Sequence, residues 1–307
     1  MHEHEKRDYL LKGVLPVLCA SILWAFGYFA RKIILFEITP LTLTFITAFV
    51  VSMSLMLWLR PHPLHLWRVF HAHIWNHIAL AFTGVIFGTT LMFIALDNLD
   101  LGLATVLEKL QPLFTLVLAA LFLKERLPVR VLPYCLAALI SSVFIFTEST
   151  QTLQMALSPQ NLIGVGAVIG AAFSWGMATI IGRKLMLSGV RSREVTLIRF
   201  TLAWLFLAPI LLLQGDLVTH FTLSPFVWII AVGSAIITTA GGYVLFYSGI
   251  KVVDAPTSGF LELLTPIVSL ALGLIFLDET IRYTQIFFIG LMLFSIYKIS
   301  TTKTKRT

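Results

Sequence analysis

Two acidic residues stand inside apolar stretches of this sequence, and each is followed by a proline four residues later. Glu108 precedes Pro112 in the first half of the chain, and Glu262 precedes Pro266 in the second half. Proline removes one backbone hydrogen bond and bends or breaks a helix, which frees the carbonyl four residues earlier. An acid and a free carbonyl at the same place could bind a proton, a cation or a polar ligand in the wall of a cavity.

A further polar residue stands on the same helical face as each acid. Gln111 follows Glu108 by three residues and Thr265 follows Glu262 by three, a spacing that places both side chains of each pair on one face. Ionisable groups inside a membrane are costly and face a protein interior or a cavity. We therefore predict a cavity role for Glu108, Gln111 and Glu262; the alternative is a structural role, with Glu108 paired to Lys109 or to another helix. Lys109 follows Glu108 directly and should point about 100° away from it.

The composition identifies the class of protein. Hydrophobic residues make up 58% of the 307 residues and charged residues only 12%, whereas about a quarter of the residues in a soluble domain are charged. The sequence therefore predicts an integral membrane protein, and its continuously apolar runs favour helices over a barrel. The basic residues are scattered through short loops, which does not indicate nucleic-acid binding. The two cysteines form no metal or disulfide pattern, and we expect no metal and no cofactor.

Ten apolar runs are long enough, or nearly so, to cross a bilayer, which takes about 20 helical residues. The fifth and the tenth are short. We predict spans at 14–35, 39–59, 76–96, 101–123, 130–147, 161–182, 194–213, 225–248, 255–277 and 284–301.

The distribution of basic residues sets the orientation of these spans. With a cytoplasmic N-terminus, Arg31, Lys32 and Arg282 fall on the outer side, and Lys109 and Arg199 fall within spans. The other 17 of the 22 Lys and Arg residues fall on the cytoplasmic side, as the positive-inside rule requires. We predict a multi-pass protein of the cell (inner) membrane with both termini in the cytoplasm.

The sequence also contains an internal repeat. Adding 154 to a position in the third or fourth predicted span gives its counterpart in the eighth or ninth, and the matched pairs include Gly, Asp, Glu and Pro residues. We predict two units, 1–153 and 154–307, with five helices each. Because five is odd, the second unit enters the membrane from the opposite side. The predicted fold is all-α, with ten transmembrane helices in two inverted five-helix repeats, an architecture found in many secondary transporters.

The two repeated stretches resemble a known family. "LEKLQPLFTLVLAALFLKERL" and "LELLTPIVSLALGLIFLDETI" are similar to the closing segments of the fourth and ninth helices in EamA-type proteins of the drug/metabolite transporter superfamily. The tryptophans in "SILWAFGYF" and "AAFSWGMAT" fit the same family. The resemblance implies a transporter of small metabolites, commonly an exporter, in which the first, third, fourth, sixth, eighth and ninth helices surround a cavity and the others support it.

The resemblance also selects candidate residues. Aromatic side chains on the helices that it places around the cavity are candidates for substrate contact, although packing is the alternative for each: Trp24, Tyr28, Phe93, Trp175, Tyr243 and Tyr247. We expect Pro112 and Pro266 to act as gating hinges. The family often carries an arginine in both the second and the seventh helix, but here Arg199 has Phe45 as its counterpart, so this arginine is not duplicated. We expect Arg199 to reach the cytoplasmic edge or bind a lipid phosphate rather than substrate.

The loop 60–77 carries five histidines. Metal binding there is conceivable, but acids and cysteines are lacking, and an amphipathic segment with Trp67 and Trp75 at the membrane interface fits better. The sequence as a whole predicts a secondary transporter for a small metabolite such as an amino acid, an amine or a drug-like compound. It would work by alternating access with proton coupling or exchange, with substrate, membrane lipid and protons as partners. The alternatives are a membrane-embedded lipid-modifying enzyme and a channel.

Overall fold

The computed structural model is helical throughout the part of the chain that it describes, with no strand in those residues. The described residues are 3–35, 37–99, 104, 107–125, 127–146, 161–214, 224–276 and 283–302. The predicted boundary between 153 and 154 lies outside them and remains a prediction.

The first half of the chain begins with α1 (Glu3–Tyr9), η1 (Leu10–Val14) and α2 (Leu15–Ile34), which follow one another without a turn. The next elements are α3 (Pro40–Leu59), the short α4 (Pro63–Ala72), and α5 (Ile74–Ala81), η2 (Phe82–Phe87) and α6 (Gly88–Asn98). The half ends with α8 (Gln111–Phe122), η3 (Val129–Val131) and α9 (Leu132–Phe146).

The second half has a closely similar order of elements. It contains α11 (Leu162–Leu187), α12 (Ser192–Gln214), and α14 (Pro225–Ser234) with η5 (Ala235–Gly241) and α15 (Gly242–Ile250). It closes with α16 (Ala255–Leu261), α17 (Leu264–Phe276) and α18 (Tyr283–Ser300). Both η2 and η5 are wide π-helical turns, and shifting η2 by 154 residues places it on 236–241, within one residue of η5. A repeated irregularity of this kind indicates a repeated function, because π turns concentrate at functional sites.

In the described residues, eight helices are long and apolar enough to cross a membrane, and Gln111–Phe122 and Val129–Ile145 are shorter apolar helices. The predicted count of ten spans is therefore not established by helix length. The fourth predicted span, 101–123, is regular only from Gln111 onward, because the backbone turns at Lys109 and Leu110. The described residues thus give a multi-pass membrane protein whose fourth and fifth predicted spans are the short ones.

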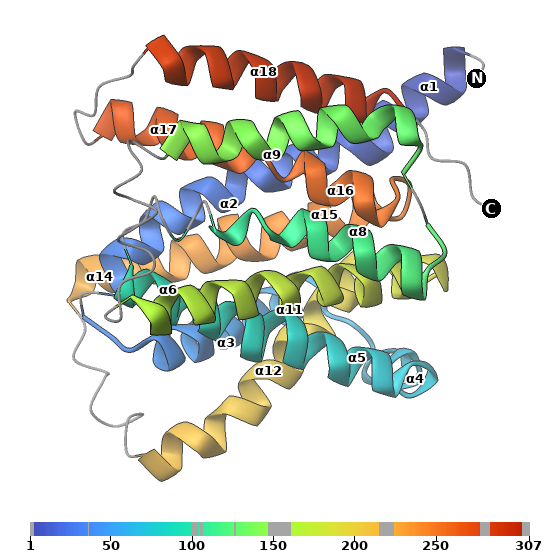
Figure 1. Ribbon diagram of the computed structural model, residues 1–307. Helices are drawn as coiled ribbons and strands as arrows, with labels where there is room; N and C mark the ends of the chain where they lie inside the picture. Colours follow the sequence, from blue (N-terminus) through green and yellow to red (C-terminus); the bar gives the residue numbers. More distant parts are fainter. Residues whose placement is uncertain are drawn as a thin grey trace.

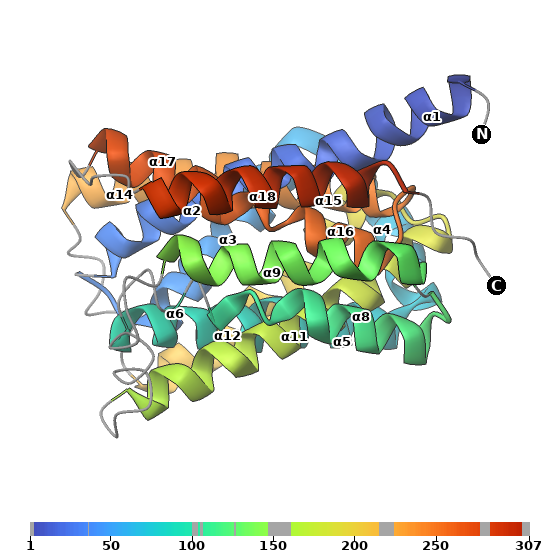
Figure 2. The same cartoon turned by 45° about the horizontal axis from the view of Figure 1, so that its top comes forward.

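The long helices run roughly along one direction (Figure 1). Helices α9 and α18 pack against each other on one side of the molecule, and α3, α5 and α12 form the opposite side. Between them lie α2, α6, α8, α11, α15 and α16. Figure 2 shows the same helices with α18 and α9 turned to the front. Helix α1 and the end of α18 lie at the same end of the bundle.

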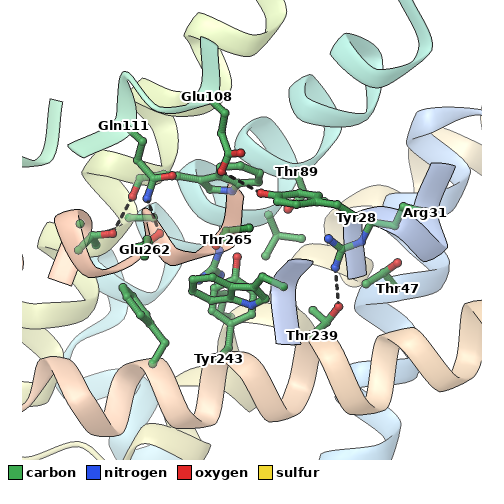
Figure 3. Close-up of a pocket in the computed structure, with 18 of the residues that line it drawn as sticks. Tyr28, Arg31, Thr47, Thr89, Glu108, Gln111, Thr239, Tyr243, Glu262 and Thr265 are labelled. Carbon is green, nitrogen blue, oxygen red and sulfur yellow. Dashed lines mark hydrogen bonds between the residues drawn. The ribbon is translucent and has the colours of Figure 1, made fainter. Parts of the chain in front are cut away.

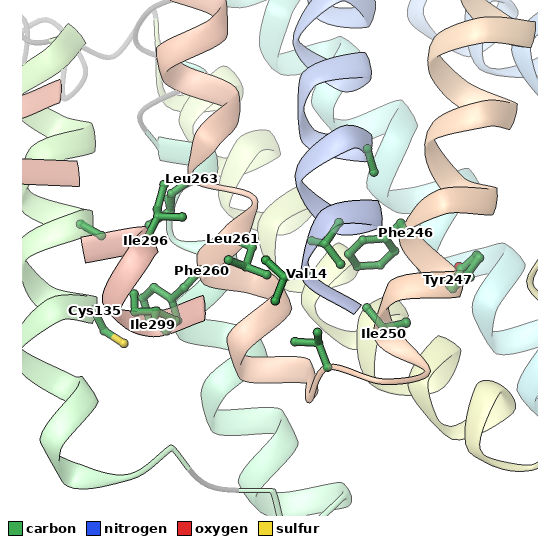
Figure 4. Packing of buried hydrophobic residues seen from close by; sticks show 14 of the residues in the cluster. Val14, Cys135, Phe246, Tyr247, Ile250, Phe260, Leu261, Leu263, Ile296 and Ile299 are labelled. Carbon is green, nitrogen blue, oxygen red and sulfur yellow. The ribbon is translucent and has the colours of Figure 1, made fainter. Parts of the chain in front are cut away.

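The buried apolar residues form several clusters, and one of them packs α15, α16 and α18 together. Figure 4 shows Phe246 and Ile250 of α15 near Val14, with Phe260 of α16 and Ile299 of α18 farther along the same cluster. Helices α9 and α18 contribute a stacked ring pair, Phe144 and Phe288, whose centroids are 4.5 Å apart. These two helices thus pack on the periphery and leave the central helices to surround the cavity.

Candidate functional site

One cavity lies among the central helices, and both halves of the chain line it. All nine residues predicted to contact substrate are on its wall: Trp24, Tyr28, Phe93, Glu108, Gln111, Trp175, Tyr243, Tyr247 and Glu262. Pro112 also lines the cavity, whereas Pro266 is not among the lining residues. The structure therefore brings the predicted set to one place, and whether these side chains touch a substrate stays a prediction.

The helix-breaking effect of the repeated motif positions the two acids. A short helical segment ends at Glu108, the chain turns at Lys109 and Leu110, and α8 starts at Gln111 with Pro112 in its first turn. In the second half α16 ends at Leu261, and α17 starts at Leu264 after the same kind of turn. Each acid thus lies at the end of a broken helix, as the proline spacing predicted.

Two separate sets of hydrogen bonds hold these residues, one with α2 and one between the two halves of the chain (Figure 3). Tyr28 donates its hydroxyl to Glu108 Oε1 over 2.9 Å, and Lys109 Nζ donates to Glu108 Oε2 over 3.2 Å. Gln111 Nε2 donates to Glu262 Oε2 over 3.1 Å, which joins the two halves of the chain. The second oxygen of Glu262, Oε1, is buried and has no hydrogen-bond partner among the described residues.

The expected direction of Lys109 was wrong. Its side chain is 6% exposed and lies against the carboxylate of Glu108 instead of pointing away from it. The helical step of about 100° does not apply, because the backbone leaves the helix at this residue. Glu108 is therefore a carboxylate with two donors, one of them a cation.

Arg31 was expected on the outer side, near the end of the first predicted span, and its place on the cavity wall was not predicted. It belongs to α2, is 8% exposed and lines the cavity. Its Nη2 donates to Thr239 Oγ1 of η5 over 2.8 Å, and its Cζ lies 5.6 Å from the ring centres of both Tyr28 and Phe93. Arg31 stands at the end of an apolar run, and counting residues along that run does not reveal whether its side chain turns into the cavity.

Arg199 also differs from its prediction, which was an outward-pointing side chain. It is 2% exposed and lines the cavity. Its Nη1 donates to the Tyr247 hydroxyl over 2.6 Å, its Nη2 donates to the carbonyl of Gly84 in η2, and its Cζ lies 4.2 Å from the ring centre of Tyr243. A Cβ on Gly84 would lie 2.3 Å from Nη2, so the glycine gives the guanidinium its space. The acceptors inside the fold hold this arginine away from the membrane edge.

Helices that were expected only to support the cavity also line it. Thr44 and Thr47 of α3, and Arg199 of α12, lie on the wall. Three further threonines on the wall were not predicted: Thr89, Thr179 and Thr239. Thr265 lies on the wall, as its spacing of three residues from Glu262 predicted. Thr44 and Thr47 are three residues apart in an otherwise apolar helix, and this spacing was the signal that could have identified them.

The comparison with protein families gives a match over most of the chain. The EamA-like transporter family matches residues 11–147 and again 162–301. The chain belongs to the EamA-like transporter family. The double match covers both halves and agrees with the resemblance seen in the two proline-containing stretches.

Relatives of this EamA-like protein are named as transporters. It is 26% identical to the riboflavin transporter ImpX of Fusobacterium nucleatum subsp. nucleatum, over 95% of this chain and 99% of that protein. It is 25% identical to a probable amino-acid metabolite efflux pump of Escherichia coli, over 92% and 91% of the two chains. It is also 26% identical to the threonine/homoserine exporter RhtA of Escherichia coli, over 70% and 68%. Family and relatives point to small-molecule transport rather than to an enzyme.

The fold is shared with a solved structure. One protein of known crystal structure superposes with a TM-score of 0.72 at 17% identity, over 94% of this chain and 99% of that chain. At this identity the similarity establishes the fold alone. The EamA-like chain therefore has the helix arrangement of a known structure over nearly its full length.

On the cavity wall of the EamA-like chain, Trp24 and Trp175 each face a glycine of the opposite half. A Cβ on Gly88 would lie 2.6 Å from Nε1 of Trp175, and a Cβ on Gly242 would lie 2.6 Å from Nε1 of Trp24. Trp175 donates Nε1 to the carbonyl of Gly84 over 3.1 Å. The Nε1 of Trp24 is buried without a partner in the described part of the chain. The matched glycines thus let a ring of one half approach the backbone of the other.

Two further elements of the sequence, Glu125 and the histidine segment 60–77, lie outside the cavity. Glu125, which closes the first repeated stretch, accepts hydrogen bonds at Oε1 from Arg183 Nε and Nη2 over 3.1 and 3.0 Å, and at Oε2 from Ala255 N over 3.0 Å. This buried ion pair ties α11 to the first residue of α16. The histidine segment forms α4, which buries no side chain and exposes Trp67, and the first turn of α5, in which His77 is buried. No group of three or more metal-ligating side chains occurs in the described ranges.

Proposed function

We propose that this EamA-like protein is a secondary transporter that moves a small metabolite, such as an amino acid, an amine or a drug-like compound, out of the cytoplasm. The observation that carries the proposal is the cavity that both halves line, with Gln111 of one half bonded to Glu262 of the other. A polar site between two related halves is where a transporter binds its cargo. The names of the relatives, which include amino-acid exporters, support the substrate range.

The proposed topology has ten spans in two inverted five-helix repeats, with both termini in the cytoplasm and the protein in the inner membrane. Three observations support it: the bias of the basic residues, the location of α1 and the end of α18 at one end of the bundle, and the repeat of η2 as η5. A reporter domain fused after Thr307 should be cytoplasmic. An external reporter would contradict the inverted arrangement.

The proposed mechanism is alternating access, driven by protons or by exchange. Broken helices support it, because the turns at 109–110 and 262–263 let each half-helix tilt without unfolding the other half. Glu262 is the candidate proton carrier, since one of its oxygens is unpartnered while both oxygens of Glu108 accept hydrogen bonds. Nine cavity residues are proposed as substrate contacts, with Pro112 and Pro266 as the gating hinges.

The test is transport by purified protein in liposomes. A panel of labelled amino acids and amines is followed into and out of the vesicles, with and without a pH gradient. Export by a secondary transporter predicts movement that depends on the protein and saturates with concentration, and proton coupling predicts that the gradient drives accumulation. Liposomes with the same amount of a heat-denatured sample are the control. Flux that never saturates would instead indicate a channel.

A further inference from the structure

The cavity contains two buried guanidinium groups, and neither has a carboxylate partner. Among the described residues, the cavity has one ion pair, between Glu108 and Lys109. Arg31 and Arg199 form no ion pair with these residues. A buried charge without a counter-ion is costly unless hydrogen bonds or a ligand compensate it. The compensation for these two arginines therefore has to come from neutral acceptors, from aromatic rings or from a bound anion.

The two guanidinium groups occupy equivalent places in the two halves. Arg199 donates to the backbone of η2 and to Tyr247, while Arg31 donates to Thr239 of η5 and lies over Phe93. Phe93 and Tyr247 are 154 residues apart, and η2 and η5 are the repeated π turns. The same local environment thus surrounds a guanidinium group in each half.

This equivalence bears on the arginine that the second predicted helix lacks. The counterpart of Arg199, 154 residues earlier, is Phe45, so the arginine was expected not to be duplicated. Arg31 comes from α2 instead of α3 and places its guanidinium group in the equivalent environment. A second arginine is therefore absent when the two halves are matched by a shift of 154 residues, but a second guanidinium group is present at the equivalent place in the structure.

The two groups differ in how fully their donors are used. Arg199 has acceptors for Nη1 and Nη2, namely a tyrosine hydroxyl and a carbonyl. Arg31 has five N–H donors and one acceptor in the described part of the chain, Thr239. Figure 3 shows Arg31 at one side of the cavity and Glu262 at the other, with the Tyr28–Glu108 pair between them. The Nε of Arg199 is buried without a partner among the described residues, so Arg199 keeps one donor group for a ligand and Arg31 keeps more.

We infer that Arg31 binds a carboxylate of the transported molecule, and that Arg199 marks the equivalent anion position in the other half. The assignment rests on the proposed transport function and narrows its substrates to those with an acid group. With Glu108 neutralised by Lys109, the remaining formal charges are those of two arginines and Glu262, an excess of one positive charge. A carboxylate is attracted to this cavity, and an amine without an acid group is repelled by the two arginines.

The experiment measures binding to the full chain in detergent, by quenching of the fluorescence of the cavity tryptophans. The probes are matched pairs of acid and amide: L-threonine and L-threoninamide, L-phenylalanine and L-phenylalaninamide, phenylacetate and phenylacetamide. We expect at least one acid to bind about tenfold or more tightly than its amide. Equal binding of acids and amides, binding of the amides alone, or no binding by any acid would overturn the assignment.

Three variants locate the effect. Arg31→Gln should remove the preference for the acid and leave amide binding unchanged, and Arg31→Lys should restore part of it, because the charge remains but the planar pair of donors is lost. Arg193→Gln changes an exposed arginine outside the cavity and should bind like the parent chain. A preference for the acid that survives in a monodisperse Arg31→Gln sample would refute the role of Arg31.

Transport of the same probes separates this inference from the proposed function. Each probe that binds is loaded into proteoliposomes and exchanged against external probe. Acid-selective binding that depends on Arg31 without exchange supports the inference and contradicts the transport proposal. Saturable exchange of amines and amides at the rate of the acids supports transport and contradicts the carboxylate assignment.

Discussion

The two halves of the chain share a framework and differ in the polar groups that it holds. Each half breaks a helix beside an acid, but Glu108 accepts bonds from Tyr28 and Lys109, whereas Glu262 accepts one from Gln111 and keeps an unpartnered oxygen. The counterpart of Lys109 is the apolar Leu263. The repeat therefore sets the geometry of the site, and single differences between the halves decide which acid is neutralised and which is available.

The arginines of the two halves differ in the same way. Arg31 in "ARK" follows Trp24 by seven residues and Arg183 in "GRK" follows Trp175 by eight, yet Arg31 lies in the cavity and Arg183 forms a buried ion pair with Glu125. Similarly placed arginines thus line the cavity in one half and form an ion pair outside it in the other. Substitutions that compare the halves test this division of roles.

The largest effect is expected from the acids. Glu262→Gln keeps the shape of the side chain and removes its titration, so transport driven by a pH gradient should fall to the level of protein-free liposomes. Exchange at equal pH on the two sides should persist. Glu108→Gln should reduce stability more than coupling, because it leaves Lys109 without its counter-charge. The measurement is uptake of a transported probe with and without the gradient, for both variants in parallel.

The opposite order of effects on proton coupling would assign the proton-carrying role to the other half of the chain. Coupling lost in Glu108→Gln but kept in Glu262→Gln would assign the proton to the first half. Unchanged pH dependence in both variants would exclude both acids as proton carriers.

The next effect concerns the buried pair outside the cavity. Glu125→Ala removes the partner of the guanidinium of Arg183 and an acceptor of Ala255 N, and should lower the free energy of unfolding by about 3–5 kcal/mol. Asp8→Ala, which breaks the exposed pair with Lys12, should change it by about 0–1 kcal/mol. Thermal unfolding in detergent compares the two. Similar melting temperatures for both variants would show that Glu125 does not hold α16 in place.

The prolines are expected to have a smaller effect, on rate. Replacing Pro112 and Pro266 by Ala permits the missing backbone hydrogen bonds and should give straighter, stiffer helices, with the fold intact and turnover reduced several-fold. Turnover and binding affinity measured on one sample separate lost motion from lost site geometry. Stable, monodisperse protein with the turnover of the parent chain would rule out a hinge.

The sequence was sufficient for the features that depend on composition and spacing. The apolar runs placed most helices within a few residues, and the proline spacing placed both helix breaks at the acids. The repeat brought Glu108 and Glu262 to one cavity, where Gln111 of the first half bonds to Glu262 of the second. These features follow from the spacing of residues along the chain and from the covalent geometry of proline, and both can be read from one sequence.

The sequence was not sufficient where the outcome depends on contacts between distant segments. Arg31 and Arg199 were assigned by their distance from a predicted span end, and Lys109 by the helical step of about 100°. The two arginines lie on the cavity wall with partners far along the chain, Thr239 and Tyr247, and Lys109 lies there because the helix breaks beside its partner Glu108. A guanidinium group extends far from its backbone, so its location depends on which acceptors the fold supplies. The count of ten spans failed to be established for a related reason, because a helix broken at Lys109 has no single length.

The smallest expected effect distinguishes the two tryptophans. Trp175→Phe removes the donor to the Gly84 carbonyl and should cost about 1 kcal/mol of stability. Trp24→Phe removes an Nε1 that has no partner among the described residues, so it should be neutral or slightly stabilising in the unliganded protein. Both changes remove similar apolar area, so the difference between the two melting temperatures isolates the hydrogen bond. If ligand binding supplies the acceptor for Trp24, Trp24→Phe should weaken binding while leaving the free protein unaffected. Equal destabilisation by both variants would show that the two rings play the same part, and the asymmetry between the halves would then be confined to the charged groups.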